Sequence, residues 1–119
     1  MTSVTRLGDL ERAVMDEVWD AAAPLTGRQV ADALASRGLA YTTVLTVLTR
    51  LERKGLLQRD ASARAHTYAP VASRDDHVTL LMQQALGQAD DRQAALQHFA
   101  RSVSPAEAEA LRRALDGLT

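Results

Sequence analysis

Apolar residues recur at helical spacing in the first third of the chain. Leu10, Val14 and Val18 are each four residues apart, so they fall on one face of a helix. This pattern predicts a helix over 9–21. A second helix is predicted over 27–36, because Thr26 is a favourable N-cap and Gly38 provides a stop.

The segment that follows is rich in β-branched residues, so propensity alone would allow a strand. Its periodicity indicates a helix instead, because Val44, Val47, Leu48 and Leu51 repeat at i, i+3, i+4 and i+7. We therefore predict a helix over 42–54, ended by Gly55. The outward positions on this helix are Thr42, Thr43, Thr46, Thr49, Arg50 and Arg53.

After this helix, the apolar residues no longer follow helical spacing. Residues 56–60 and 65–69 resemble two short strands joined by a polar tip and closed by Pro70, and Leu25 could form a strand stub. Three more helices are predicted, over 74–88, over 91–102 and after Ser104. The last has a strong start signal, because Ser104 can cap it, Pro105 opens it and Glu107 follows.

The order of these elements predicts a mostly α fold with a small β-hairpin. Helix, strand stub, helix, helix, strand, strand is the order of a winged helix-turn-helix. We expect residues 1–70 to form a winged-helix DNA-binding domain and residues 71–119 to form a three-helix dimerisation region.

Composition narrows the class of protein. Only 3% of residues are aromatic and 46% are hydrophobic, so the core must be aliphatic. The absence of cysteine excludes disulfides, thiolate metal sites and cysteine nucleophiles. With no apolar run of the ~20 residues a membrane span needs and no visible signal peptide, we expect a cytoplasmic protein without membrane insertion.

No catalytic or cofactor-binding motif is apparent. The paired carboxylates at 75–76 and 90–91 lie at predicted helix starts, where they complement the helix dipole. His66, His77 and His98 are far apart and lack ligand spacing, so we expect surface or wing residues rather than a metal site. We predict neither an enzyme nor a resident cofactor.

The net charge of −1 conceals a local basic stretch. Residues 42–68 carry a net charge of +3, whereas the segments on either side carry −2 each. A recognition helix in the major groove needs hydroxyls, methyls and guanidinium groups, which threonine and arginine supply. The residues predicted to contact DNA are Thr42, Thr43, Thr46, Arg50 and Arg53 on the helix, with Arg28 and Arg64 on phosphates. The alternative is a solvated surface helix and hairpin.

The three helices after residue 70 are too short to bury a core alone, so their apolar residues need a partner surface. A second copy of the chain would supply it and would read a palindromic site. The predicted dimerisation residues are Leu81, Met82, Leu86, Leu96, Phe99, Leu111 and Leu115. The alternative is that these helices fold back on residues 1–70.

The chain resembles the penicillinase repressor family, the BlaI/MecI group of bacterial winged-helix repressors. The resemblance is carried by LERAVMDEVW (10–19), YTTVLTVLTRLERKGL (41–56), RAHTY (64–68) and SPAEAEALRRAL (104–115). It implies a homodimeric repressor of β-lactamase or related resistance genes. Such a repressor would bind a dyad operator through residues matching Thr42, Thr43, Thr46 and Arg50.

The resemblance also implies release of repression by a membrane sensor protease that cleaves the C-terminal region. In the family the scissile bond joins Asn to Phe, and the matching pair here is His98–Phe99, without the Asn. Phe99 has a second interpretation, as an anchor of the dimer helix. A copper-responsive branch with a C-terminal cysteine motif is excluded by the cysteine count.

Two other functions are compatible with the pattern. One is a winged-helix regulator switched by a small ligand at the dimer interface. The other is a helical adaptor that does not bind DNA, which the basic helix and hairpin disfavour.

Overall fold

Helices α1–α3 and a small sheet account for most of the chain before residue 71. The computed structural model describes residues 7–118. It divides into two compact units, one ending at Leu81 and the other beginning at Met82. The elements of the first unit are α1 (Asp9–Asp20), β1 (Leu25–Thr26), α2 (Gly27–Ala33), a 3₁₀ turn (Ala35–Arg37), α3 (Tyr41–Arg53), β2 (Leu57–Asp60), β3 (Thr67–Pro70) and the start of α4 (Arg74–Gly87).

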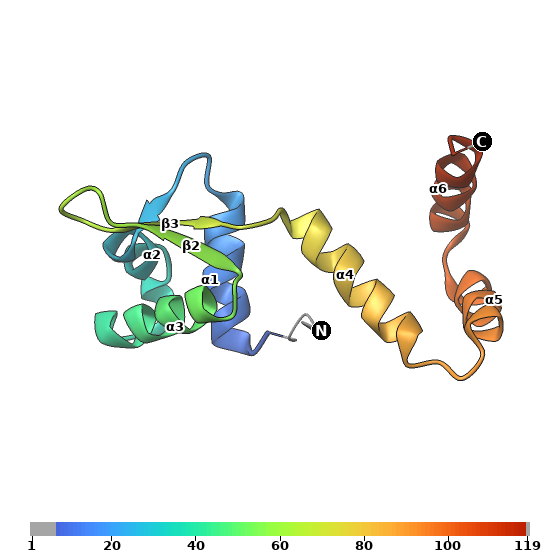
Figure 1. Cartoon of the computed structure of the whole chain (residues 1–119), viewed down its shortest axis with the longest axis horizontal. Helices are drawn as coiled ribbons and strands as arrows, with labels where there is room; N and C mark the ends of the chain where they lie inside the picture. Colours follow the sequence, from blue (N-terminus) through green and yellow to red (C-terminus); the bar gives the residue numbers. More distant parts are fainter. Residues whose placement is uncertain (1–6, 119) are drawn as a thin grey trace. The chain divides into compact units, whose positions relative to one another are not determined.

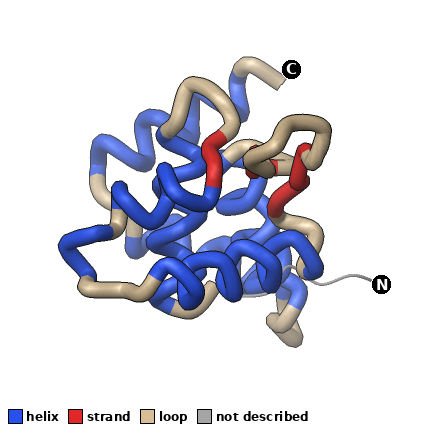
Figure 2. The backbone as a smooth tube through the Cα atoms, turned by 90° about the vertical axis from the view of Figure 1, so that its left-hand side faces the viewer, coloured by secondary structure: helices blue, strands red, loops and turns tan. Residues whose placement is uncertain are grey.

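The predicted fold class is confirmed. Helices make up most of the described chain and the strands are short (Figure 2). Strands β2 and β3 form the predicted hairpin, and the loop between them, the wing, extends from the sheet (Figure 1). The predicted strand stub is real, because β1 pairs antiparallel with β3 and gives the order β1-β3-β2.

Most element boundaries differ from the sequence prediction by one to three residues, and two of these differences have a clear local cause. The second helix ends at Ala33 and continues as a 3₁₀ turn, which Gly38 closes in the left-handed conformation at φ 67°. Pro70 is the last residue of β3 rather than a stop after it. Proline is tolerated there because β1 pairs only with Thr67 and Tyr68, so no strand on that side lies opposite its missing amide.

The core forms where α3 packs against α1 and α2. Its fully buried side chains are aliphatic or Met, as the composition predicts, and include Met15, Val30, Leu48 and Leu51. The predicted α3 stripe of Val44, Val47, Leu48 and Leu51 is buried along its whole length. Burial of one such side chain contributes about 1.5–3 kcal/mol, so packing overrides the strand propensity of the β-branched residues.

Gly27 allows α2 to approach α3 closely. A Cβ atom at this position would lie 2.8 Å from Leu45 Cδ2 and 3.4 Å from the Tyr41 hydroxyl. A larger residue would force these side chains to move. The angle between the two helices of the helix-turn-helix therefore depends on a small residue at the start of α2.

A buried ion pair joins the start of α1 to the end of α3. Lys54 Nζ lies 2.6 Å from Glu11 Oε2, and the Glu11 side chain is only 8% exposed. The other carboxylate oxygen accepts a hydrogen bond from the Gly8 amide at 3.1 Å. Burial alone would raise the pKa of Glu11, but the hydrogen bonds from Lys54 and Gly8 and the nearby positive charges outweigh it and lower the pKa below 4.5.

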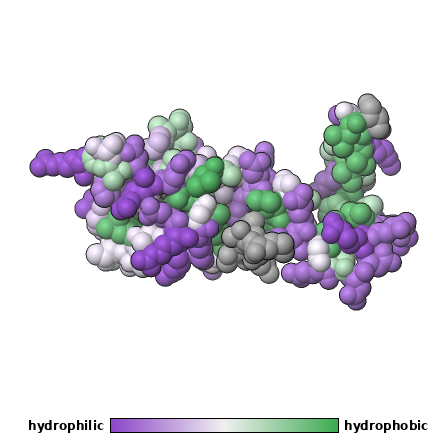
Figure 3. Space-filling view, viewed as in Figure 1, coloured by the Kyte–Doolittle hydropathy of each residue, from purple (hydrophilic) through white to green (hydrophobic). Residues whose placement is uncertain are grey.

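The second unit contains the end of α4, then α5 (Arg92–Ser102) and α6 (Pro105–Asp116). Asp91 caps α5 by accepting from the Ala94 amide, and Ser104 and Glu107 form the predicted capping box of α6. No residue between 82 and 118 is buried. Apolar side chains instead gather on the surface of α6 (Figure 3). Within residues 7–118, the helices are too short or too polar to cross a membrane.

Replacing Lys54 with Met should destabilise the first unit by about 1–3 kcal/mol, because Glu11 would keep its charge in a buried place without its cation. In the folded chain the Glu11 pKa is lowered, so its stabilising contribution is present above about pH 4.5 and is lost as the pH falls through the folded value. Urea unfolding at several pH values measures both effects. We expect the free energy of unfolding of Lys54→Met to change less with pH in this acidic range than that of the wild type.

The matched control is Arg59→Met, which breaks the more exposed Arg59–Glu52 pair, 3.4 Å apart. An exposed pair contributes less than about 1 kcal/mol. Equal losses in the two variants would contradict the importance assigned to burial of Glu11.

Candidate nucleic-acid interface

The outer face of α3 carries the predicted DNA-contacting residues. Thr42, Thr46, Arg50 and Arg53 are exposed and Thr43 is half-buried. They point outward because the opposite stripe of the same helix fills the core. An exposed row of threonine and arginine side chains along one helix is the chemistry that base edges and phosphates require.

Thr46 has a constrained side chain. Its hydroxyl donates to the Thr42 carbonyl oxygen at 3.0 Å, one helical turn earlier. This bond uses the hydroxyl proton within the helix and fixes the rotamer. The oxygen remains able to accept a hydrogen bond, and the methyl group can contact the methyl of a thymine.

A surface hollow of about 430 Å³ lies on this face of α3. It brings together three of the predicted residues, Thr46, Arg50 and Arg53, with Leu45 and Thr49. Thr42 and Thr43 lie outside it, nearer the start of the helix.

A second hollow of about 420 Å³ joins α3 to the start of α2 and to the wing. Arg28 and Arg64 line it from these two elements, together with Tyr41, Thr49 and His66. Leu45 and Thr49 line both hollows, so the two form one continuous surface. The predicted phosphate-contacting arginines, which are far apart in sequence, therefore line the same hollow as residues of α3.

Eight residues that line this surface were absent from the predicted contact set: Thr26, Gly27, Tyr41, Leu45, Thr49, Ala65, His66 and Tyr68. A signal for three of them is present in the sequence, because residues 41, 45 and 49 recur every four positions and fall on one helical stripe. No comparable signal exists for His66, which joins the surface only because the hairpin folds back toward α3.

Arg28 is held in place by Tyr41. Its guanidinium carbon lies 4.2 Å from the centre of the Tyr41 ring, which is a cation–π contact. The contact restricts the Arg28 side chain, which lines the second hollow together with Tyr41. The wing loop is also ordered locally, since Asp60 accepts a hydrogen bond from the Ser62 amide at 2.9 Å and hydrogen bonding to Ser62 lowers the pKa of Asp60.

The positive charge available at this surface comes from four arginines. Two of the five basic residues in 42–68 are neutralised, because Lys54 pairs with Glu11 and Arg59 with Glu52. No ion pair with any residue between 7 and 118 is formed by Arg50, Arg53 and Arg64 of this segment or by Arg28 of α2. Their charge is free to attract a polyanion.

The histidines form no metal site within the described part of the chain, where no group of three or more potential ligands is close enough. His66 is exposed on the wing and His98 on α5, as expected. The expectation for His77 is wrong. This residue is only 5% exposed, because the first turn of α4 packs against α1 and places its ring 5.3 Å from Trp19.

The predicted dimerisation residues lie on α4, α5 and α6 and none of them lines the two hollows. Leu81 and Leu86 are half-buried, whereas the others are exposed, Phe99 by 48% and Leu115 by 56%. His98 and Phe99 both lie inside α5.

Comparison with known proteins agrees with this geometry. The family model described as "Penicillinase repressor" matches residues 7–117. The transcriptional regulator BlaI of Mycobacterium tuberculosis is 58% identical over 119 residues, covering 97% of this chain and 86% of that protein. The solution structure of the monomeric form of Bacillus licheniformis BlaI in complex with the blaP half-operator matches with a TM-score of 0.53. It is 26% identical and covers 64% of this chain and 93% of that one.

A more distant structure supports the fold alone. The transcriptional regulator Tm0710 of Thermotoga maritima has a TM-score of 0.52 and 15% identity, covering 93% of this chain and 72% of that one. The family match spans nearly the whole chain, and the same segment holds both the winged-helix face and the C-terminal helices. The chain therefore belongs to the penicillinase repressor family and is a transcriptional regulator rather than an enzyme.

Proposed function

We propose that the chain is a homodimeric transcriptional repressor that binds a palindromic operator through α3 in the major groove. The observation that carries this proposal is the continuous surface along α3, α2 and the wing, with its four arginines that form no ion pair within residues 7–118. The Bacillus relative of known structure binds a half-operator, and its matched region corresponds to 64% of this chain. A repressor of this kind acts on the chromosome, hence in the cytoplasm.

The residues divide into base-reading and backbone-contacting groups. Arg50 and Arg53 lie in the hollow on the outer face of α3, where guanidinium groups can reach guanine edges. Thr46 offers a methyl group and an acceptor oxygen, and Thr42 and Thr43 extend the contact toward the helix start. Arg28 and Arg64 would contact phosphates on either side of the groove and set the register of the helix.

The helices of the second unit are proposed to pair with those of a second copy. Leu96, Phe99, Leu111 and Leu115 remain exposed on α5 and α6, and no side chain between 82 and 118 is buried. Large exposed apolar side chains in short helices that lack a core favour association. A two-fold dimer would present two copies of α3 to the two halves of a palindrome.

The regulated genes are proposed to be β-lactamase or related resistance genes, in accord with the family to which the chain belongs. Relief of repression would follow cleavage of the C-terminal region by a sensor protease, with His98–Phe99 as the bond at the family's position. Both side chains are exposed, but the bond lies within α5. Cleavage would therefore require local unwinding of this helix, and it would remove α6 from the dimer.

Substitution of Arg50 and of Arg64 should have different effects on DNA binding. Arg50→Ala should cost about 1–3 kcal/mol on an operator and little on random DNA, because a base contact is lost. Arg64→Ala should weaken binding to both and reduce the slope of log K against log salt by about one, because a phosphate contact is lost. Fluorescence anisotropy at several salt concentrations measures both, using a dyad duplex selected from a random pool by the wild-type protein.

The control is Arg113→Ala, which removes an equal charge from the exposed face of α6. It should leave DNA affinity and salt slope unchanged. An Arg50→Ala protein with wild-type affinity for the selected dyad would remove Arg50 from the interface.

Leu115→Glu should dissociate the dimer, because it places a charge among the apolar side chains of the paired surface. Sedimentation equilibrium should show dissociation at concentrations where the wild-type protein is a dimer, with a dimer dissociation constant raised at least about tenfold, equal to 1.4 kcal/mol. The matched control is Gln93→Glu, which adds the same charge at an exposed polar position of α5. A Leu115→Glu protein that sediments as the wild type does would contradict the assigned interface.

A further inference from the structure

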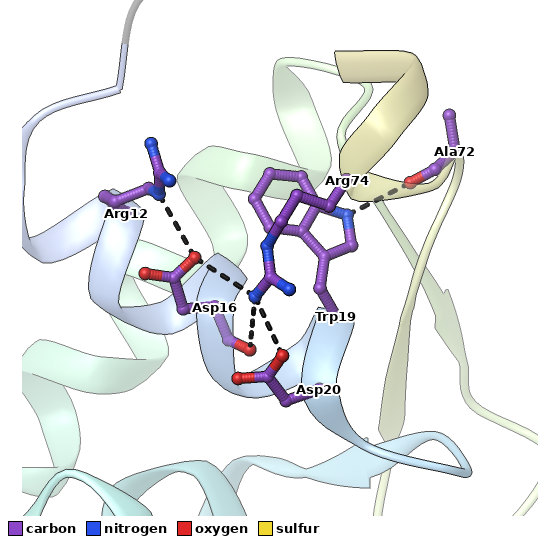
Figure 4. A network of polar contacts seen from close by, with 6 residues as sticks. All are labelled: Arg12, Asp16, Trp19, Asp20, Ala72 and Arg74. Carbon is purple, nitrogen blue, oxygen red and sulfur yellow. Dashed lines mark hydrogen bonds and ion pairs between the residues drawn. The ribbon is translucent and has the colours of Figure 1, made fainter. Parts of the chain in front are cut away.

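A cluster of polar contacts joins the start of α4 to α1, on elements other than those that line the DNA-facing hollows. We call it the α1–α4 cluster and define it by Arg12, Asp16, Trp19, Asp20 and Arg74 (Figure 4). The Arg74 guanidinium lies 2.9 Å from an Asp20 carboxylate oxygen and 3.3 Å from one of Asp16. It also donates to the Asp16 main-chain carbonyl oxygen at 3.4 Å. Arg74, which is the first residue of α4, thus contacts two successive turns of α1.

Trp19 attaches the adjoining chain to the same place. Its indole N–H donates to the Ala72 carbonyl oxygen at 3.1 Å, in the short segment between β3 and α4. The Arg74 guanidinium carbon lies 5.4 Å from the centre of the indole ring, within the range of a cation–π contact. The ring is therefore held between the connecting segment and the arginine, as Figure 4 shows.

The first turn of α4 is buried on this side as well. His77 is 5% exposed and lies against Trp19. Burial, and secondarily the nearby charge of Arg12, lowers the pKa of His77, so its neutral form is favoured there. Arg12 also pairs with Asp16 at 3.1 Å and thereby orients the carboxylate that Arg74 contacts. The start of α4 is attached by hydrogen bonds, ion pairs and ring packing together.

None of the cluster residues lines either DNA-facing hollow. The cluster instead attaches the first turn of α4 to α1. Only residues 71–73 separate β3 from α4, and α4 then runs without interruption from Arg74 to Gly87. Its last turns belong to the second unit, which begins at Met82. The attachment at Arg74 therefore fixes the first turn of the helix that continues to the proposed dimerisation residues.

We propose that Arg74 is a positioning residue that sets the separation of operator half-sites the repressor accepts. The proposal rests on the proposed function, in which two copies of α3 bind one palindrome. A two-fold protein selects one half-site spacing only when the connection between its DNA-binding unit and its dimer contact is stiff. One additional base pair moves a half-site by about 3.4 Å along the helix and rotates it by about 34°, given 10–10.5 base pairs per turn. A flexible connection would tolerate that displacement.

The test compares full-length wild type with Arg74→Ala on a set of dyad duplexes. The dyad is selected from a random pool by the wild-type protein, and the set contains its native spacing, one or two base pairs inserted or removed at the centre, and a single half-site. We expect wild-type affinity to fall about tenfold or more with each altered spacing. Arg74→Ala should bind the native spacing about tenfold more weakly and should show a much flatter dependence on spacing.

The single half-site serves as the folding check, because it reports on the α3 surface alone. We expect Arg74→Ala to bind it as the wild type does. Trp19→Phe is the second variant, since it keeps an aromatic ring at this position and removes the indole N–H that binds Ala72, and it should flatten the spacing profile in the same direction. Arg92→Ala is the matched control, because this arginine is exposed at the start of α5 and forms no ion pair within residues 7–118.

Two results would overturn the proposal, and they differ. A wild-type spacing profile in both Arg74→Ala and Trp19→Phe would show that the cluster contributes stability only, while the proposed repressor function stands. Wild-type protein that binds the dyad no more tightly than the half-site would overturn the dimeric operator-binding function and the spacing role with it.

Discussion

Burial of the apolar stripe of α3 is the constraint on which the rest of the winged-helix unit depends. Val44, Val47, Leu48 and Leu51 fill the space between α1 and α2. Their burial selects a helix for a segment whose composition would also suit a strand, and it also turns Thr46, Arg50 and Arg53 outward. One face of α3 thus forms part of the core, and the opposite face forms the candidate DNA interface. A change that rotated α3 about its axis would alter both.

Polar contacts place the neighbouring elements around this helix. The Glu11–Lys54 pair joins the start of α1 to the end of α3. It also neutralises Lys54, so this residue does not add to the positive charge available for DNA. Gly27 allows α2 to approach until Arg28 can stack on Tyr41. The wing brings Arg64 to the other side of the same hollow. Arg28, Arg50, Arg53 and Arg64 form no ion pair within residues 7–118, and all four lie on one continuous surface.

The two compact units differ in how their apolar residues are used. In the first unit the apolar side chains of α1–α3 are buried within the same copy of the chain. In the second unit, Phe99, Leu111 and Leu115 stay exposed. The N-terminal ends of α5 and α6 are capped, but the apolar side chains of these helices are not covered by other residues of the unit. The α1–α4 cluster lies at the start of the helix that continues from one unit into the other. In the proposed function, the first unit recognises DNA, the second associates with a second copy, and α4 connects the two units.

Local patterns in the sequence determined the elements and the outward face of α3, because helical periodicity and capping involve residues three or four positions apart. They also indicated the hairpin, and the family resemblance was visible in the same strings. Only the tertiary structure decided that Leu45 and Thr49 line both hollows, that His66 joins them, and that His77 is buried. The contacts that bring distant segments together, between Glu11 and Lys54, Trp19 and Ala72, and Asp16 and Arg74, span 43, 53 and 58 residues. No local pattern encodes such pairs, because their formation depends on how the core brings distant elements together.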